Sequence, residues 1–143
     1  MWFLTGNSYA QFFNNPDNWR FVLKDYPNLH LNLGHFGGFN QWKRLQMGKN
    51  NTWASRIMSM LSEYDGLYAD ISFTNAYPEI LNLIYKTASH SKLVRERMLY
   101  GLDYYMVVTR GHYRSLKADF DVFMGDVIMN QIMMRNARAF LYL

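Results

Sequence analysis

The chain has 143 residues and a mass of 17.0 kDa, which predicts one domain over residues 1–143. Half of its residues are hydrophobic and 18% are charged, which excludes an intrinsically disordered protein, and the absence of cysteine excludes disulfides and thiolate metal sites. The net charge of +4 leaves phosphate as a partner to consider. Met1–Tyr9 lacks the pattern of a signal sequence and no apolar run is long enough to span a membrane, so we expect a cytoplasmic protein that binds no membrane.

The first predicted elements are a helix and a strand. Asn15 suits a helix N-cap and Pro16 its first turn, and Pro27 ends the helix. The apolar residues of Leu29–Gly34 then predict a strand. The glycines and polar residues from position 37 to position 51 predict one long loop after it.

Two more strand-like segments follow, each after a predicted helix. A helix from Thr52 to Asp65 carries its apolar residues on one face, and another begins at Pro78 and fades at His90. A last helix is predicted over 120–143, with a break near Gly125. The strand-like segments are Gly66–Phe73 and Arg97–Asp103, and with the first strand they recur at an interval that suits repeated βα units.

This alternation predicts an α/β fold with parallel strands, because helical crossover connections cover the faces of a parallel sheet. Three strands suit either a small doubly wound sheet or part of a closed (β/α)8 barrel of the TIM type. The chain length favours the small sheet, since a whole barrel takes roughly 250 residues. Local composition leaves the two architectures open.

Polar residues directly after the predicted strands are the candidate functional residues, since α/β folds bind ligands beyond the carboxyl ends of their strands. His35 precedes two glycines and could bind a metal or transfer a proton, or only hydrogen-bond its own loop. Asp103 ends the third strand and needs a partner or a metal if buried, although capping the next helix is the commoner role. Strand alternation puts Asp70 and Ser72 on the same side, and a structural role is favoured for Asp70.

The other histidines are interpreted as structural or solvated. His30 is expected to pack or hydrogen-bond structurally, and His90 to lie in solvent. His112 and its flanking arginines could form an anion-binding loop, but an exposed basic loop is the commoner meaning. We expect no nucleic-acid partner; one would use the basic residues Arg110, Arg114 and Lys117. The P-loop, dinucleotide, zincin and α/β-hydrolase motifs are absent from the sequence.

Five segments carry a family resemblance when taken in order. They are Tyr26-Pro27-Asn28-Leu29, Gly34-His35-Phe36-Gly37-Gly38 with Trp42, Leu67-Tyr68-Ala69-Asp70-Ile71-Ser72, Arg97-Met98-Leu99-Tyr100-Gly101-Leu102-Asp103-Tyr104 and Arg135-Asn136-Ala137-Arg138-Ala139-Phe140-Leu141. Together they resemble the C-terminal part of the amidohydrolase superfamily. The branch that they resemble contains aminocarboxymuconate-semialdehyde decarboxylase and related metal-dependent hydrolases.

The resemblance implies a (β/α)8 barrel with a mononuclear metal site at the carboxyl ends of its strands, of which this chain would hold about strands five or six to eight. His35 matches the histidine of the family's His-x-Gly-Gly motif, which is an acid–base catalyst or a metal ligand. Asp103 matches the aspartate that ends strand eight and binds the metal and its water. A divalent metal, Zn²⁺ by preference, is thereby implied, with His35 and Asp103 as the ligands from this chain.

The sequence also departs from the family pattern. The His-x-His pair of strand one and the histidine of strand five have no counterpart, and Met1–Thr5 is compared with the last stretch of strand five. Leu102 replaces the usual Ser or Thr before the strand-eight aspartate. A catalytic zinc site ordinarily has three protein ligands, so the metal site is expected to be incomplete in a single copy of this chain.

Two functions are therefore expected. The first is a metal-dependent hydrolase or decarboxylase of the amidohydrolase family, acting on a small organic molecule. The second is a non-catalytic half-barrel that self-associates, or pairs with a missing N-terminal half, to cover open strand edges. The expected partner is a small-molecule substrate, and the formation of a homo-oligomer is left open.

Overall fold

The structure is a computed structural model that describes residues 6–108 and 113–142. Its sheet has three parallel strands in the order β1-β2-β3, formed by Leu31–Leu33, Leu67–Asp70 and Met98–Leu99. Leu31 pairs with Leu67, and Ala69 pairs with Met98. Each strand lies within a predicted strand-like segment, so the prediction of repeated parallel βα units is confirmed. The observed strands are shorter: the chain leaves the sheet in a turn soon after β1 and β2, and in a segment without a regular element, residues 100–103, after β3.

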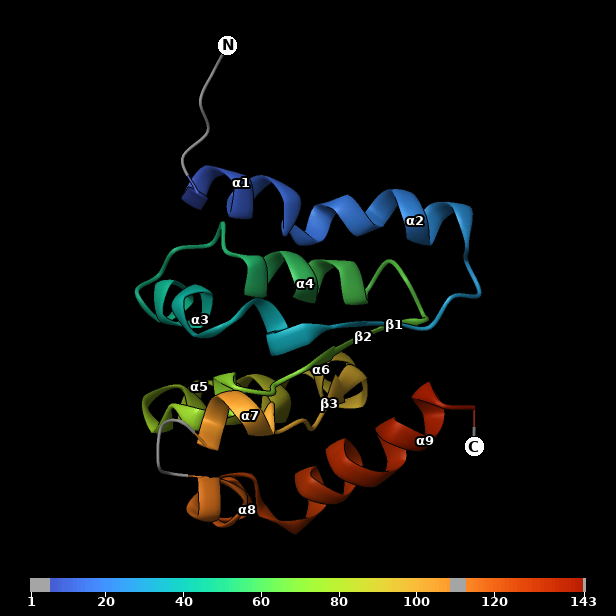
Figure 1. The fold of residues 1–143 in the computed structure, drawn as a ribbon. Coiled ribbons are helices and arrows are strands. Elements are labelled where there is room, and N and C mark those ends of the chain that lie inside the picture. The colour runs from blue at the N-terminus through green and yellow to red at the C-terminus, as the bar shows by residue number, and fades with distance from the viewer. Residues whose placement is uncertain (1–5, 109–112, 143) are drawn as a thin grey trace.

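Helices connect the strands in the alternating order of an α/β fold (Figure 1). The α-helices are α1 Gly6–Phe13, α2 Trp19–Asp25, α3 Phe39–Gln46, α4 Trp53–Leu61, α5 Pro78–His90, α6 Lys92–Arg97, α7 Tyr104–Val108, α8 Tyr113–Asn130 and α9 Asn136–Phe140. Short 3-10 turns are η1 Pro16–Asn18, η2 Gly34–Gly37 and η3 Thr74–Ala76, and the π-helical turn η4 is Gln131–Arg135.

Local capping explains where the predicted helices begin. The Asn15 side chain accepts a hydrogen bond from the N–H of Asp17 at 3.1 Å, and Pro16 follows in the first turn. Thr52 and Ser55 form a reciprocal capping box at the start of α4. Pro78 begins α5, where its missing N–H costs nothing. Gly125, with φ of 67°, interrupts α8 at the predicted break.

Two predictions of local structure are wrong. The region from position 37 to position 51 contains the helix α3, which has no side-chain N-cap and is stabilised by burying Trp42 in the core. Arg97 ends the helix α6 and does not belong to a strand, because Ser91 caps a short helix that continues up to β3.

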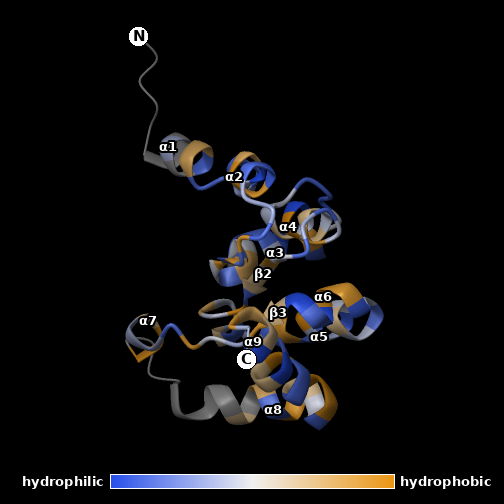
Figure 2. Ribbon diagram, turned by 90° about the vertical axis from the view of Figure 1, so that its right-hand side faces the viewer, coloured by the Kyte–Doolittle hydropathy of each residue, from blue (hydrophilic) through white to orange (hydrophobic). Residues whose placement is uncertain are grey.

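The core lies on one face of the sheet. Leu33, Leu67, Ala69 and Met98 point to this face and pack with the apolar sides of α4 and α5. Figure 2 shows helices stacked along this side of the sheet, while α7 stands on the other side. The architecture is an α/β layer that is consistent with part of a barrel.

The opposite face of the sheet carries different side chains. Asn32 is exposed there, and Asp70 and Leu99 occupy the same face on the next two strands. Parallel strands bring their carboxyl ends to one edge, which lies toward η2 and η3. None of the helices in the described residues has the length and apolarity needed to cross a membrane.

Asn136 connects the C-terminal helix to the third strand. Its Nδ2 donates to the carbonyls of Arg95 at 2.7 Å and Met98 at 2.6 Å, and the residue is only 1% exposed. We expect Asn136→Ala to lower the free energy of unfolding by about 2–3 kcal/mol, because it leaves buried carbonyls without donors. Urea unfolding followed by circular dichroism measures this loss. The control is Asn130→Ala, which changes an exposed asparagine nearby; equal losses in both variants would contradict the prediction.

Candidate functional site

The residues that the sequence singled out follow the carboxyl ends of the three strands. The turn η2 with His35 follows β1, Asp70 ends β2 with Ser72 two residues later, and Asp103 lies four residues beyond β3. Because the strand order is β1-β2-β3, His35 and Asp103 belong to the two outer strands of the described sheet. Asp70 and Ser72 lie between them.

The backbone of His35 is held in a left-handed conformation, with φ of 62°, and Phe36 follows with φ of 46°. Such values are uncommon in residues other than glycine and need support from the surroundings. The His35 N–H donates to Asp70 Oδ1 at 3.1 Å, and the His35 carbonyl accepts from Thr74 Oγ1 at 2.7 Å. Phe36 is fully buried. These contacts present the exposed imidazole at the edge of the sheet.

The imidazole of His35 is oriented by Ser72. His35 Nδ1 lies 2.8 Å from the Ser72 carbonyl and 3.2 Å from Ser72 Oγ. A carbonyl can only accept, so Nδ1 carries the hydrogen. In the neutral ring, Nε2 then has a free lone pair, and the described part of the chain supplies no hydrogen-bond partner to it. Such a nitrogen can accept a proton or bind a metal.

Asp70 organises this turn from the neighbouring strand. Its Oδ1 accepts from the N–H groups of His35 and Ser72 and from Ser72 Oγ, and its Oδ2 accepts from Asn32 Nδ2 at 2.7 Å. All of these donors are protein groups, which agrees with the structural role favoured for Asp70. The hydrogen bond between Asp70 and Ser72 confirms that the two side chains lie on the same side.

Gly101 allows the segment after β3 to lie close to Ser72 and Asp70 at the end of β2. A Cβ at this position would lie 2.9 Å from the Cβ of Ser72 and 3.7 Å from Asp70 Oδ1. The buried Asn75 also links the two segments, because its Nδ2 donates to the Gly101 carbonyl at 3.0 Å. Asn75, Thr74 and Asn32 were not predicted as site residues. The alternation around Asn32 could have indicated its face, whereas Thr74 and Asn75 carry no local signal.

Asp103 lies at the start of α7. It has φ of 51°, and its carbonyl accepts the N–H groups of Met106 and Val107 at 3.0 and 3.1 Å. The carboxylate makes no hydrogen bond or ion pair with the described residues, so the backbone and not the side chain closes the first turn of α7. The partly exposed carboxylate remains available to a ligand.

Two cavities border His35. One of about 430 Å³ is walled by the rings of Phe13, Trp19 and Trp53, with Gly37 and Gly38 at its rim. The other, of about 480 Å³, has Phe39, Phe73 and Tyr77 in its walls together with the amides of Asn40 and Gln41. Both volumes suit a small organic molecule.

The donors present do not by themselves fit a catalytic metal. Within residues 6–108 and 113–142, no three or more His, Cys, Asp or Glu side chains are grouped so as to hold a metal ion. His35 Nε2 and the Asp103 carboxylate are two donors, whereas a catalytic zinc ordinarily has three protein ligands and a water. The described residues of this edge therefore offer two donors, His35 Nε2 and the Asp103 carboxylate, to a metal ion.

The remaining titratable candidates lie away from this edge. His30 packs on Tyr142 and bonds to the Phe140 carbonyl, and His90 is exposed at the end of α5, as predicted. Burial raises the pKa of Tyr100, and the charge of Asp121 raises it further. The ring of Tyr100 faces Phe120 of α8 at 5.1 Å and not the imidazole of His35. His112 and Arg110, the side chains of Arg114 and Lys117, and Met1–Thr5 lie outside the described residues.

Comparison with known families decides the relationship. The family model for amidohydrolases matches residues 20–143. The chain belongs to the amidohydrolase family. Members of this family commonly use divalent metals, and the match includes all three strands and both His35 and Asp103. Neither the curated proteins nor the solved structures contain a significant match.

Proposed function

We propose that this chain carries the proton-transfer part of an amidohydrolase-family site that acts on a small organic molecule. The observation that supports it most is the state of His35. Its Nδ1 is bound to the Ser72 carbonyl and its Nε2 faces no protein acceptor or donor in the described residues, beside a cavity of about 430 Å³. Hydrolysis and decarboxylation both need a group that gives or takes a proton at the reacting atom.

The proposed role of His35 is to take a proton at Nε2 and later return it. A neutral imidazole accepts the proton from water, and the imidazolium that forms keeps both contacts of Nδ1. Ser72 Oγ accepts from Nδ1 while donating to Asp70 Oδ1, so the Asp70 carboxylate lies behind the ring and stabilises the positive charge. Asp103 is proposed to orient a polar group of the substrate or its water from the other outer strand.

The metal dependence, with zinc as the preferred ion, belongs to this proposal as well. His35 and Asp103 are the residues of this chain that would contribute to such a site, and the further ligands would have to come from groups outside the described residues. The branch that contains aminocarboxymuconate-semialdehyde decarboxylase is likewise proposed, on the motifs around His35 and Asp103. Cytoplasmic location remains a prediction from the sequence.

The direct test measures metal and activity together. Purified protein is assayed for hydrolysis of small esters and lactones and for decarboxylation of small carboxylic acids, before and after addition of Zn²⁺, with bound metal measured by mass spectrometry. We expect Asp103→Asn to lower the activity about 100-fold, within the range for a positioned catalytic group. Asp25→Asn, which changes an exposed carboxylate at the end of α2, is the control and is expected to have no effect. A well-folded wild-type protein that remains inactive on all of these substrates after addition of Zn²⁺ would contradict the proposal.

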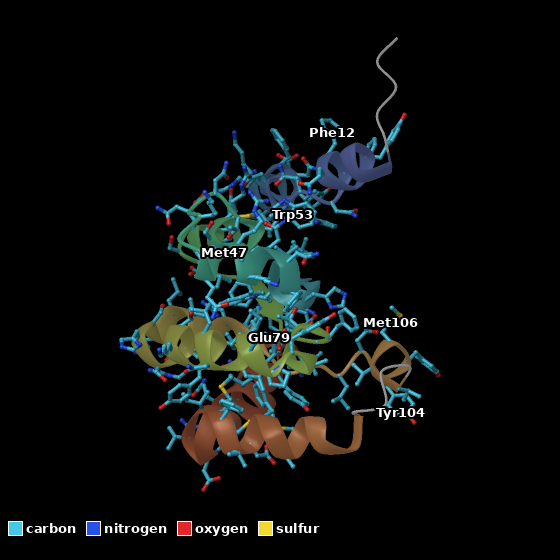
Figure 3. The ribbon with its side chains drawn as sticks, turned by 90° about the vertical axis from the view of Figure 1, so that its left-hand side faces the viewer. Phe12, Met47, Trp53, Glu79, Tyr104 and Met106 are labelled. Carbon is cyan, nitrogen blue, oxygen red and sulfur yellow. The ribbon has the colours of Figure 1, made fainter. Side chains whose placement is uncertain are left out.

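A second candidate function is a non-catalytic half-barrel that associates with a second copy of itself or with a complementary barrel half on another chain. The observation in its favour is the exposure of apolar side chains on α7, which stands apart from the helix layer (Figure 2). Tyr105 is 86% exposed there, and Tyr104 and Met106 project at the margin of the molecule (Figure 3). Sedimentation decides between the candidates: an inactive dimer favours association, whereas a stable, active monomer rejects it.

A further inference from the structure

Another cavity lies at the opposite, amino end of the strands. It measures about 530 Å³, and the segment before each strand contributes a polar residue to its wall: His30 before β1, Asp65 before β2 and Arg97 before β3. Tyr68 of β2 and Tyr142 after α9 complete its aromatic part. In Figure 1 this is the end at which α9 and the C-terminus lie. It is separate from the edge that carries His35.

The guanidinium of Arg97 has few hydrogen-bond acceptors around it in this cavity. The group has five N–H donors, but with the described residues it makes one hydrogen bond, from Nη1 to the Tyr68 hydroxyl at 3.0 Å. Its Nε is buried without a partner among those residues, and its Nη2 lies 3.7 Å from Asp65 Oδ1, which is too far for a hydrogen bond. The side chain is only 24% exposed, whereas that of Asp65 is fully exposed. A largely buried cation with so few acceptors favours binding of an anion.

His30 adds a second nitrogen to the same wall. Its Nδ1 lies 2.6 Å from the Phe140 carbonyl and therefore carries a hydrogen, and its ring stacks on Tyr142 at 3.8 Å. The described residues make no hydrogen bond to Nε2, which becomes a donor when the ring is protonated. The contacts with Phe140 and Tyr142 fix the orientation of the ring without using this nitrogen.

We infer that this cavity is a binding site for a small oxyanion, either a phosphate group or a carboxylate, held by the guanidinium of Arg97 with His30 beside it. The ring of Tyr68 lies 5.2 Å below the guanidinium carbon and keeps the planar group in place. Bidentate hydrogen bonds from a guanidinium suit both kinds of oxyanion. Among the described residues that line the cavity, Asp65 is the acidic one, and the bound oxyanion replaces its loose contact with Nη2.

The test titrates the whole chain with inorganic phosphate and, separately, with acetate. Calorimetry is carried out at constant ionic strength, set with chloride, so that general screening does not change during the titration. We expect saturable binding with a dissociation constant on the order of 1 mM, and the tighter of the two anions identifies the class of ligand. Arg97→Gln is expected to weaken binding at least about tenfold.

Two further variants make the result decisive. Lys92→Gln removes one positive charge from the same helix at an exposed position outside the cavity, and is expected to leave the dissociation constant within about twofold of the wild-type value. Arg97→Lys keeps the charge without the bidentate geometry and is expected to give an intermediate affinity, and it replaces Arg97→Gln if that variant fails to fold. Absence of saturable binding, or equal weakening in Lys92→Gln and the Arg97 variant, would overturn the inference.

Discussion

Replacing His35 with glutamine is expected to lower the turnover of the amidohydrolase-family reaction by a factor of about 10²–10⁴, the usual contribution of a general acid–base group. Glutamine can keep a hydrogen bond to the Ser72 carbonyl, which His35 Nδ1 makes at 2.8 Å. It has no nitrogen that takes a proton at neutral pH, so the chemical step is lost while the turn η2 is retained. The measurement is kcat and KM on the substrate that the activity screen identifies.

Controls separate the loss of chemistry from the loss of structure. His90→Gln changes an exposed histidine at the end of α5 and is expected to leave kcat unchanged. Ser72→Ala removes the hydroxyl between His35 and Asp70 but keeps the carbonyl contact, so a smaller loss of kcat, about tenfold, is expected. Full activity of a folded His35→Gln protein would show that the imidazole has no catalytic role.

Trp42→Ala is expected to lower the free energy of unfolding by about 3–5 kcal/mol, as for other large aromatic residues removed from a core. Trp42 is fully buried, and its ring packs edge to face on Phe36 at 5.3 Å. Its Nε1 donates to the Phe36 carbonyl at 3.0 Å, so the variant creates a cavity and also leaves this carbonyl without its donor. Urea unfolding followed by circular dichroism gives the change directly.

Trp19→Ala provides the matched comparison for Trp42. Trp19 is 41% exposed, and its removal is expected to cost less than half as much, because the exposed ring buries less apolar area. Trp42→Phe keeps most of the ring contact but loses the hydrogen bond, so an intermediate effect is expected. A loss for Trp42→Ala no larger than that for Trp19→Ala would contradict the packing described for η2.

The turn η2 links these two predictions. Trp42 and Phe36 hold the buried side of the turn, and Asp70 and Thr74 hold the backbone of His35. Left-handed residues cost about 1–2 kcal/mol each, so this geometry requires both sets of contacts. We expect a weakened core under η2 to disturb the orientation of His35 as well as the stability of the fold.

Much of the fold could be predicted because its signals are local. Asn15, Thr52 and Pro78 mark helix starts through bonds and backbone angles formed within three residues of each position. The helix α3 has no such marker, since its N-cap is Gly38, which has no side chain to accept a hydrogen bond, and its stability comes from burying Trp42. Contacts of that kind depend on the packed structure and were missed.

The candidate site shows the same division. His35 and Asp103 could be proposed from their places after apolar strands, and Asp70 and Ser72 from strand alternation. Their hydrogen-bond partners could not be proposed, because the Ser72 carbonyl reaches His35 Nδ1 only when β1 and β2 pair and both turns fold back. The same holds for Arg97, whose scarcity of acceptors becomes visible only in the cavity at the amino ends of the strands.

By itself, the sequence determined that helices and strands alternate and that the strands run parallel. It also determined the family and which residues follow the carboxyl ends of the strands, because all of these depend on local periodicity, capping and motifs. Only the tertiary structure decided which nitrogen of His35 has no hydrogen-bond partner among the described residues, that both oxygens of Asp70 accept hydrogen bonds from protein donors, and that Asp103 has no partner among the described residues. Each of these depends on atoms that are more than thirty residues apart or on the path of the chain after a strand. Long-range pairing therefore sets the chemistry of the site, while local signals set its location.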